Sequence, residues 1–514
     1  MTLTLDIDKH GVLHQSLQVH NTGATRFRLD ALAHTLPLPP EAAEILTTTG
    51  RHLRERHPQR EPLTIGVHAR ESRRGRPGAD ATVITAVGSP GFGFEHGRVW
   101  AAHLAWSGNH RVSVERQPSG IAVLQAGELL LPGEVILEPG ETYAAPELLA
   151  TCGDGLNEVS ARFHSYFRAR PEHPHSERPV TLNTWEAVYF RQELGQLTAL
   201  ADAAATIGVE RLVLDDGWFL GRRDDTAGLG DWYVDPEVWP DGLDPLIRHV
   251  HDLGMQFGLW VEPEMVNPVS RLAVEHPEWI LHTGSTLPPA ARNQQVVDLS
   301  NPDAFAYILE RLDALLSENA IDYLKWDHNR DLLQPGGADG RAAVHENVLA
   351  LYRLLAELKA RHPGIEIESC ASGGARVDAG ILHLTDRIWT SDCIDPLERL
   401  PIQKYTGVLV PPELMGAHIG SPVAHSTGRA SSLALRAATA LFGHLGIEWD
   451  ITEASDAERA ELAAWVRLHK RMRTLAHSGR FVHADLGDPA MDLRGVISSA
   501  QDEAWFVYTQ VGST

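Results

Sequence analysis

The spacing of apolar residues changes near residue 180. Before it, short segments alternate apolar and polar residues and are separated by Gly, Pro, Asn and Asp, which is typical of antiparallel strands joined by turns. The clearest segments are Thr2–Asp8, Ala81–Val87, Arg111–Arg116 and Gly133–Leu137. The first long helical pattern covers Gly155–Arg170. We therefore predict a β-rich N-terminal domain over residues 1–170, followed by a Pro- and His-rich linker over residues 171–179.

From residue 180 onward, short apolar strands alternate with helical patterns, as in a parallel sheet built of βα units. The nine candidate strands are Val180–Trp185, Arg211–Leu214, Phe257–Val261, Gln295–Leu299, Tyr323–Trp326, Ile365–Ser369, Ile388–Thr390, Leu414–Ile419 and Ile447–Ile451. Helices are expected between them, for example over Pro245–Leu253, Asp303–Ser317 and Arg341–Arg361. A (β/α)8 barrel needs one strand fewer, and we predict that Gln295–Leu299 lies outside it. The α/β pattern thus predicts a barrel over residues 180–477.

The barrel region is expected to end with a helix over Ala457–His477. Three strand-like segments follow, at Phe481–Ala484, Leu493–Ser498 and Ala504–Thr509. So few strands make only a marginal domain on their own. We therefore expect residues 478–514 to form a short C-terminal β segment, either a small cap on the barrel or an incomplete part of a larger unit.

Polar and aromatic residues gather where the candidate barrel strands end. These clusters are Asn183–Glu186, Asp215–Trp218, Trp260–Glu264, Lys325–Asp327, Glu368–Cys370 and Ser391–Asp392. In a (β/α)8 barrel the carboxyl ends of the strands converge on one face, and that face carries the chemistry. Carboxylates that are far apart in the chain would therefore meet in one pocket.

Asp327 and Asp392 each follow an apolar strand and stand close to a tryptophan. A single strand-end Asp is more often a cap or an ion-pair partner, but the repetition on separate strands favours catalysis. Glycoside hydrolysis needs one ionised carboxylate and one protonated carboxylic acid across the scissile bond. We expect Lys325 to keep a neighbouring Asp ionised and an indole-lined environment to raise the pKa of the other.

Asp215 and Asp216 are adjacent, so in an extended strand their side chains would point to opposite sides. A kink at Gly217 would allow both to enter the pocket as acceptors for sugar hydroxyls. Metal binding is the competing explanation, but the sequence has no HExxH motif, EF-hand pattern or pair of His at ligand spacing, so we expect no metal site. GxSxG is absent and Pro422 follows Ser421, which argues against a serine hydrolase. A sugar-binding barrel without catalysis is the alternative from another class.

Composition narrows the possible partners. The 514 residues include 45 Lys and Arg against 68 Asp and Glu, a net charge of −23, which disfavours nucleic acid and anionic membranes. The three cysteines, at positions 152, 370 and 393, have neither CxxC spacing nor a His cluster beside them. The N-terminus has no apolar signal region, and no stretch approaches the length of a membrane span. We expect a soluble, cytoplasmic protein that does not contact membranes.

Several motifs closely resemble the α-galactosidases of glycoside hydrolase family 36. They are LDDGWF (214–219), GLWVEPEMV (258–266), YLKWDHNR (323–330), ESCASGGARVD (368–378) and IWTSDCID (388–395). NTWEA (183–187), RNQQVVDLS (292–300) and AHIGSPVAHSTGR (417–429) fit the same family in the same order. The resemblance covers residues 133–451 and, more loosely, the N-terminal β region. Eight motifs in register are far more specific than any one of them.

The resemblance implies an N-terminal β-supersandwich, a (β/α)8 catalytic barrel and a C-terminal antiparallel β-sandwich. It also implies hydrolysis of terminal α-galactosides with retention of configuration and without metal or cofactor. By position, Asp327 would be the nucleophile and Asp392 the acid/base, at the ends of the fourth and sixth strands. Asp215 and Asp216 match the receptors for the galactose 4- and 6-hydroxyls. The other matching positions of the sugar subsite are Trp260, Arg292, Lys325, Asn329, Cys370 and Gly373, and Trp185 is expected to form a wall.

The sequence departs from the family pattern beside the acid/base, where Cys393-Ile394-Asp395 replaces the usual Asn-Thr-Asp. The N-terminal domain is shorter than in the long members, and most of the C-terminal sandwich is missing. We expect a homo-oligomeric, retaining exo-α-galactosidase that acts on small soluble galactosides of the melibiose and raffinose type. α-N-acetylgalactosaminidase on the same fold is the nearest alternative, to be decided by the loop over residues 370–374. A retaining mechanism also predicts that the Asp327 and Asp392 carboxyl groups lie roughly 5–5.5 Å apart.

Overall fold

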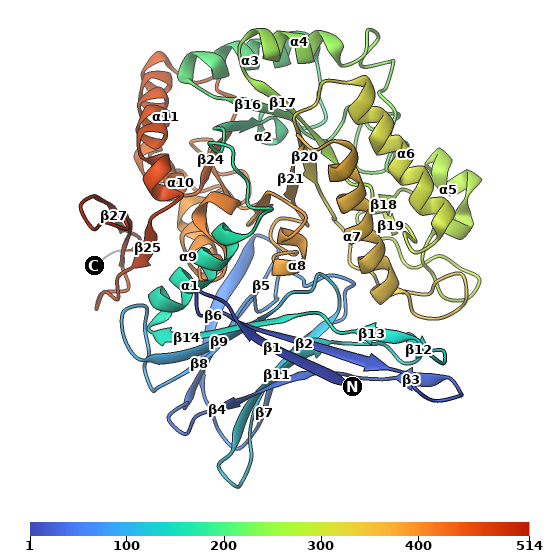
Figure 1. Ribbon diagram of the computed structural model, residues 1–514. Helices are drawn as coiled ribbons and strands as arrows, with labels where there is room; N and C mark the ends of the chain where they lie inside the picture. The colour runs from blue at the N-terminus through green and yellow to red at the C-terminus, as the bar shows by residue number, and fades with distance from the viewer. Residues whose placement is uncertain (513–514) are drawn as a thin grey trace.

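A computed structural model describes residues 1–512 of the chain (Figure 1). Its N-terminal part contains two main antiparallel sheets. The first has the order β1 (Thr2–Ile7), β2 (Leu13–His20), β14 (Leu148–Asp154), β9 (Arg98–Leu104), β8 (Thr85–Gly88), β5 (Glu44–Arg51) and β6 (Arg54–Pro62), with β13 (Thr142–Ala144) also beside β2. The second has the order β4 (His34–Leu38), β11 (Ala122–Glu128), β10 (His110–Arg116) and β7 (Gly66–Ser72), and β3 (Phe27–Leu29) pairs with β12 (Val135–Leu137).

The two sheets pack as a sandwich because each turns alternate apolar side chains inward. Val87 and Leu104 of the first sheet belong to the same buried cluster as Val112 and Leu124 of the second. The β-rich architecture predicted for the N-terminal part is therefore confirmed. One predicted segment is shorter than expected, since β8 begins at Thr85 rather than near Ala81.

Eight parallel strands close into a barrel. They are β15 (Thr181–Asn183), β16 (Arg211–Leu214), β17 (Gln256–Val261), β20 (Tyr323–Trp326), β21 (Glu366–Ser369), β22 (Arg387–Trp389), β23 (Met415–Gly420) and β24 (His444–Glu448). The prediction that residues 295–299 lie outside the barrel is confirmed, because β19 (Gln295–Val296) pairs with β18 (Met265–Val266) in a separate small sheet. The last strand lies earlier than expected, at residues 444–448 instead of 447–451.

Helices follow the barrel strands. They are α2 (Trp185–Val188), α3 (Leu194–Ile207), α4 (Asp244–Asp252), α5 (Arg271–Glu275), α6 (Pro302–Glu318), α7 (Val344–Arg361), α8 (Ala379–Leu382), α9 (Pro396–Thr406), α10 (Leu433–Ala440) and α11 (Asp456–Ala476), with short 3-10 turns at Pro277–Trp279 and Pro412–Leu414. Long ones such as α3, α4, α6, α7 and α11 lie around the outside of the barrel (Figure 1). α6 illustrates the local rules: Asn301 caps its N-terminus, Pro302 occupies the first turn, and Ile308, Leu312 and Leu315 form its buried stripe.

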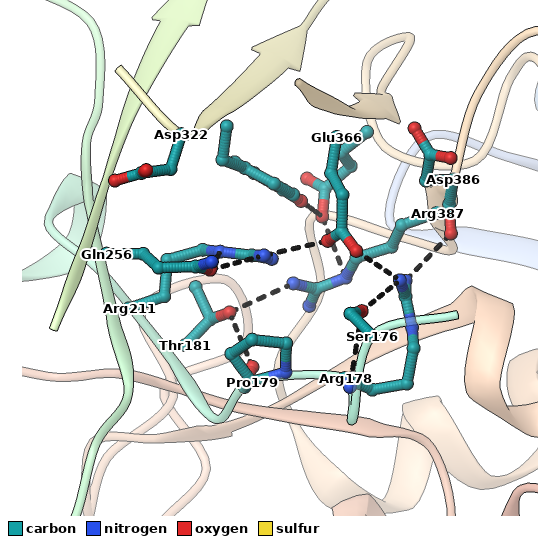
Figure 2. Close-up of polar contacts among 12 residues, drawn as sticks. Ser176, Arg178, Pro179, Thr181, Arg211, Gln256, Asp322, Glu366, Asp386 and Arg387 are labelled. Carbon is teal, nitrogen blue, oxygen red and sulfur yellow. Dashed lines mark hydrogen bonds and ion pairs between the residues drawn. The ribbon is translucent and has the colours of Figure 1, made fainter. Parts of the chain in front are cut away.

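A network of charged side chains closes the amino-terminal end of the barrel (Figure 2). The Glu366 carboxylate lies between two arginines, 3.2 Å from Arg178 and 2.7 Å from Arg211. Arg211 also donates to Gln256, and Arg178 donates to the carbonyl oxygen of Asp386. This network lies at the start of the strands, so it stabilises the barrel and leaves the opposite end for chemistry.

The chain beyond the barrel forms a small three-stranded antiparallel sheet of β25 (Arg480–His483), β26 (Met491–Ile497) and β27 (Ala504–Gln510). Phe481 and Val496 of this sheet share a buried cluster with Met472 and Ala476 of α11. The segment therefore packs as a cap on the outer helices of the barrel. α1 (Leu156–Ala169) connects the N-terminal sandwich to this region. The predicted C-terminal segment extends to residue 514, and its last two residues lie outside the described part. No helix within residues 1–512 is long and apolar enough to cross a membrane.

Candidate active site

A cavity of about 640 Å³ opens at the carboxyl ends of the barrel strands. Its lining includes nine of the eleven site residues that the sequence predicted, namely Trp185, Asp215, Asp216, Trp260, Arg292, Lys325, Asp327, Asn329 and Asp392. Asp327 directly follows β20 and Asp392 comes three residues after β22, the fourth and sixth strands of the barrel. The two carboxylates therefore meet on one face although they belong to different βα units.

The Asp327 carboxylate is held by four donors. Its Oδ2 atom accepts from Asn329 Nδ2 at 2.7 Å and from Trp260 Nε1 at 3.3 Å. Its Oδ1 atom accepts from the backbone amides of His328 at 2.8 Å and Ser372 at 3.3 Å. Four hydrogen bonds fix the orientation of a carboxylate, so Asp327 is held in one position in the cavity.

The Asp392 carboxylate has fewer hydrogen-bond partners than that of Asp327 and lies closer to solvent. Trp389 Nε1 donates to Oδ1 at 3.1 Å, and His52 Nε2 lies 2.8 Å from Oδ2. Burial opposes the charge of Asp392, but the hydrogen bond and charge of His52 outweigh it, with help from Lys325 and Arg292, and lower its pKa. The expectation that surrounding indoles would raise this pKa is wrong, because a histidine from the N-terminal domain lies beside the carboxylate.

The vicinal pair Asp215 and Asp216 is buried at the end of β16, and both side chains reach the cavity. Gly217 supplies the predicted kink, with a φ of 125° that side chains rarely adopt. Arg222 donates to both oxygens of Asp216, at 2.9 and 2.7 Å. Burial nevertheless raises the pKa of Asp216 to about 6.

Lys325 pairs with Asp215, with 2.8 Å between Nζ and Oδ2. Burial opposes the charge of this lysine, but the Asp215 carboxylate raises its pKa well above the ordinary value. The ion pair of Lys325 is thus with Asp215, two strands away in the barrel, and its charge also helps to lower the pKa of Asp392, as expected for a lysine beside the carboxylates.

Two predicted residues, Cys370 and Gly373, lie in the loop after β21 but are not among the residues that line the cavity. Cys370 is buried in a small apolar cluster with Trp389 and Ile394, one of the residues that depart from the family pattern. Burial, with the charges of Asp327 and Asp392, raises the pKa of its thiol. Gly373 has a φ of 74°, and a Cβ atom there would lie 2.7 Å from the backbone nitrogen of Asp392. Direct contact of either residue with a sugar stays a prediction.

Several residues that line the cavity were not predicted from the sequence. Those of the N-terminal domain are Gly50, Arg51, His52, Arg74, Arg76, Ala79 and Asp80, and those of the barrel include Glu186, Phe190, Arg222, Asp225, Asp331, Trp389 and Glu448. For the barrel residues a signal existed, because Glu186 and Trp389 belong to the motifs that end β15 and β22. The N-terminal residues carry no such signal, since they lie at the end of β5 and in the segments after β5 and β7 and belong to no motif.

Two further carboxyl groups of the cavity favour the protonated form. Burial and the charge of Asp392 raise the pKa of Glu186 to about 8. Burial also raises the pKa of Glu448, although Lys325 opposes it. Within residues 1–512 no group of three or more His, Cys, Asp or Glu side chains is arranged to hold a metal ion. The polar groups of the cavity therefore suit a neutral ligand rich in hydroxyl groups.

Comparison with known proteins agrees with this geometry. The profile of the melibiase family matches residues 142–479, and that of the glycosyl hydrolase family 36 N-terminal domain matches residues 1–138. The α-galactosidase of Escherichia coli is 44% identical over 98% of this chain and 71% of its own length. The α-galactosidase AgaA of Geobacillus stearothermophilus is 37% identical over 92% of this chain and 66% of its own length.

The crystal structure of AgaA superposes with a TM-score of 0.94 at 35% identity, covering 99% of this chain and 72% of that one. A variant of AgaA in complex with raffinose superposes equally well, with a TM-score of 0.94 at 34% identity over 99% of this chain and 72% of that one. This chain thus spans about two thirds to seven tenths of the length of these relatives. With both family profiles matched in order over nearly the whole chain, the protein belongs to glycoside hydrolase family 36, the family of these α-galactosidases.

Proposed function

We propose that this protein is an exo-acting α-galactosidase that releases terminal α-linked galactose from small oligosaccharides such as melibiose and raffinose. The observation that carries the proposal is the single cavity that contains Asp327 and Asp392, at the ends of β20 and β22. We propose that this cavity receives the terminal sugar of the substrate. The raffinose and stachyose bound to relatives of this family support the substrate class.

The reaction we propose is a double displacement that retains configuration. Asp327 attacks the anomeric carbon while Asp392, as an acid, protonates the glycosidic oxygen, and the leaving sugar departs. Water then attacks the galactosyl–Asp327 ester, and Asp392 takes its proton as a base. The four donors to Asp327 support its role, because they hold the carboxylate in one orientation before and after the covalent intermediate.

Sugar recognition is assigned to the remaining polar side chains of the cavity. We propose that Asp215 and Asp216 accept hydrogen bonds from the 4- and 6-hydroxyls, and that Trp185 and Trp260 form apolar walls. Arg292, Lys325 and Asn329 complete the subsite in this proposal, with Cys370 and Gly373 beside the 2-hydroxyl. An acetamido group at that carbon would need more room, so we propose galactose rather than N-acetylgalactosamine as the sugar that is released.

Turnover of two chromogenic substrates tests the activity. The purified protein should hydrolyse p-nitrophenyl α-galactoside and leave the α-N-acetylgalactosaminide largely intact, whereas the reverse preference would favour the alternative enzyme. Proton NMR during hydrolysis should show α-galactose first, before it equilibrates with the β anomer. Initial appearance of β-galactose would rule out retention.

The nucleophile can be tested separately. Asp327→Gly should abolish turnover of raffinose, and added azide should restore turnover of an activated aryl galactoside by filling the vacated space and attacking the anomeric carbon. Asp224→Gly is the matched control, since Asp224 is exposed and does not line the cavity. Undiminished activity of Asp327→Gly, or the absence of β-galactosyl azide among its products, would remove Asp327 from this role.

We further propose that the protein forms a homo-oligomer and that it works in the reducing cytoplasm. We also propose that its domains cover residues 1–170, 180–477 and 478–514. The exposed apolar row Leu3, Leu5 and Ile7 on β1, at the edge of the first sheet, supports association. The free thiols of Cys152, Cys370 and Cys393 fit a reducing compartment. Leu5→Lys should shift the protein to a smaller species in size-exclusion chromatography with light scattering. An unchanged mass would exclude this edge as the interface.

A further inference from the structure

The turn between β5 and β6 carries residues of the N-terminal sandwich into the catalytic cavity. Gly50, Arg51 and His52 line that cavity, and β6 packs against α9 of the barrel. Figure 1 shows β5 and β6 extending from the sandwich toward the barrel. A Cβ atom on Gly50 would lie 2.2 Å from the carbonyl oxygen of Arg54, so this tight turn requires a glycine.

Three contacts, all from residues at the start of β6, hold this hairpin against α9, against the segment that contains Asp392 and against the loop after β21. Arg54 lies 3.1 Å from Glu398 of α9. Ser391, the neighbour of Asp392, donates to Glu55 at 2.6 Å, and the buried Arg56 donates to the carbonyl oxygen of Gly374. The hairpin is therefore held in one register, with His52 at its tip directed at Asp392.

The His52 and Asp392 side chains form an ion pair. The hydrogen bond to Asp392 raises the pKa of His52, and the same contact lowers the pKa of Asp392. Other titratable groups lie near enough to act on Asp392 electrostatically: Glu55 on β6, Glu186 on α2, Arg292 before β19, Lys325 on β20, Cys370 after β21, Arg399 on α9 and Glu448 on β24. Among the cations of this group, the one hydrogen-bonded to Asp392 within residues 1–512 is His52.

We propose that His52 is a positioning residue for Asp392, which it holds in the orientation and the carboxylate form that act as the base in the second half of the reaction. The inference rests on the proposed function. In that half, the oxygen of water bonds to the anomeric carbon, the bond from that carbon to Asp327 breaks, and Asp327 leaves as a carboxylate. The proton of the water passes to the Asp392 oxygen. The imidazolium of His52 keeps that oxygen free of a proton until this step.

The same contact limits the first half of the reaction, because Asp392 must then carry a proton. An adjacent positive charge reduces the protonated fraction of a carboxyl group at every pH. Removing the charge should therefore extend protonation of Asp392 to higher pH. The N-terminal domain would in this way set the pH range over which the barrel works.

His52→Gln tests the charge while keeping a neutral donor near Oδ2. The limb of the kcat/KM profile that falls with rising pH should move to higher pH by roughly one pH unit. This is a small shift for the loss of a charge beside a carboxyl group, because His52 is half exposed. With a dinitrophenyl galactoside, whose departure needs no acid, kcat reports the second step, and its acidic limb should move upward as well. His57→Gln is the matched control, since His57 is an exposed residue of β6 outside the cavity. It should leave both limbs unchanged.

His52→Ala should show the same shift of the falling limb to higher pH and, in addition, a lower maximum of kcat/KM than His52→Gln, because orientation is lost together with charge. Thermal unfolding midpoints should stay close to the parent value, since the His52 side chain is 51% exposed. Limbs that coincide in His52→Gln and the parent, or that move to lower pH, would overturn the inference while leaving the proposed function intact. A parent protein without turnover of α-galactosides would overturn both.

Discussion

The Nζ atom of Lys325 lies 2.8 Å from Oδ2 of Asp215, and both side chains are buried at the end of the barrel. The same carboxylate oxygen accepts from Asn183 Nδ2 at 2.7 Å. Strands β15, β16 and β20 are thereby tied together at the floor of the cavity. Asp215 is thus a fixed acceptor whose position does not depend on the sugar, which is the condition for reading a hydroxyl group with selectivity.

Asp215→Asn and Asp216→Asn should each lower kcat/KM for p-nitrophenyl α-galactoside by roughly 10- to 150-fold, since a charged acceptor on a sugar hydroxyl contributes about 1.5–3 kcal/mol. Asp224→Asn, on an exposed turn, is the control and should stay near the parent value. Steady-state kinetics on galactosides and glucosides provide the measurement. If both variants keep the parent preference for galactose, the pair does not read the 4-hydroxyl.

Asp392→Asn should separate the two halves of the reaction. Turnover of raffinose should fall by roughly 10²- to 10⁴-fold, because its leaving sugar needs the acid. A dinitrophenyl galactoside should still form the galactosyl intermediate in a rapid burst, followed by slow hydrolysis. Azide, which needs no base, should speed the second step. Equal losses on both substrates and no burst in stopped-flow absorbance would exclude the acid/base role.

Gly373→Ala should reduce activity more than its local strain explains. The residue has a φ of 74°, and its Cβ atom would lie 2.7 Å from the Asp392 nitrogen. Gly254→Ala is a matched control, with a φ of 76° but nothing within 4 Å of the new atom. In chemical denaturation both variants should lose roughly 1–2 kcal/mol of stability from backbone strain, and Gly373→Ala should lose more because of the close contact. The Gly373 variant alone should lose most of kcat, and similar kcat values would show that this close approach is not required.

Glu366→Gln should destabilise the barrel by about 3 kcal/mol at neutral pH, because it leaves Arg178 and Arg211 without their partner. Burial opposes the charge of Glu366, but the two arginines lower its pKa to about 2. A lowered carboxyl pKa stabilises the fold fully above the unfolded value of 4.5, and this contribution is lost as pH falls toward 2.

The difference in unfolding free energy between parent and Glu366→Gln should therefore shrink as pH is lowered below the unfolded value. Urea denaturation at a series of pH values measures it. Glu278→Gln is the control, because Glu278 is an exposed residue of a surface turn. A difference that stays constant down to the acid limit of the folded protein would contradict the role assigned to this ion pair.

Much of the barrel could be predicted from the sequence because its signals are local. Strands that are covered on both sides read as short apolar runs, and β16 and β20 occupy the predicted residues. Polar residues directly after such strands must lie at one end of a parallel barrel. For this reason the sequence alone predicts that Asp215 and Asp327 lie in the same pocket. The last strand was misplaced because the apolar run continues past Glu448, where the strand ends.

The sequence by itself determined the barrel, the face that carries the chemistry, the two carboxylates and the family motifs, since each depends on residues close together in the chain. Tertiary structure decided what surrounds Asp392. His52 lies 340 positions away in the chain, in a turn without any motif, and it reaches Asp392 because the sandwich docks on α9. A pKa depends on every charge within a few ångströms, whichever segment supplies it. For that reason the direction of the Asp392 shift could be found only after the two domains were folded together.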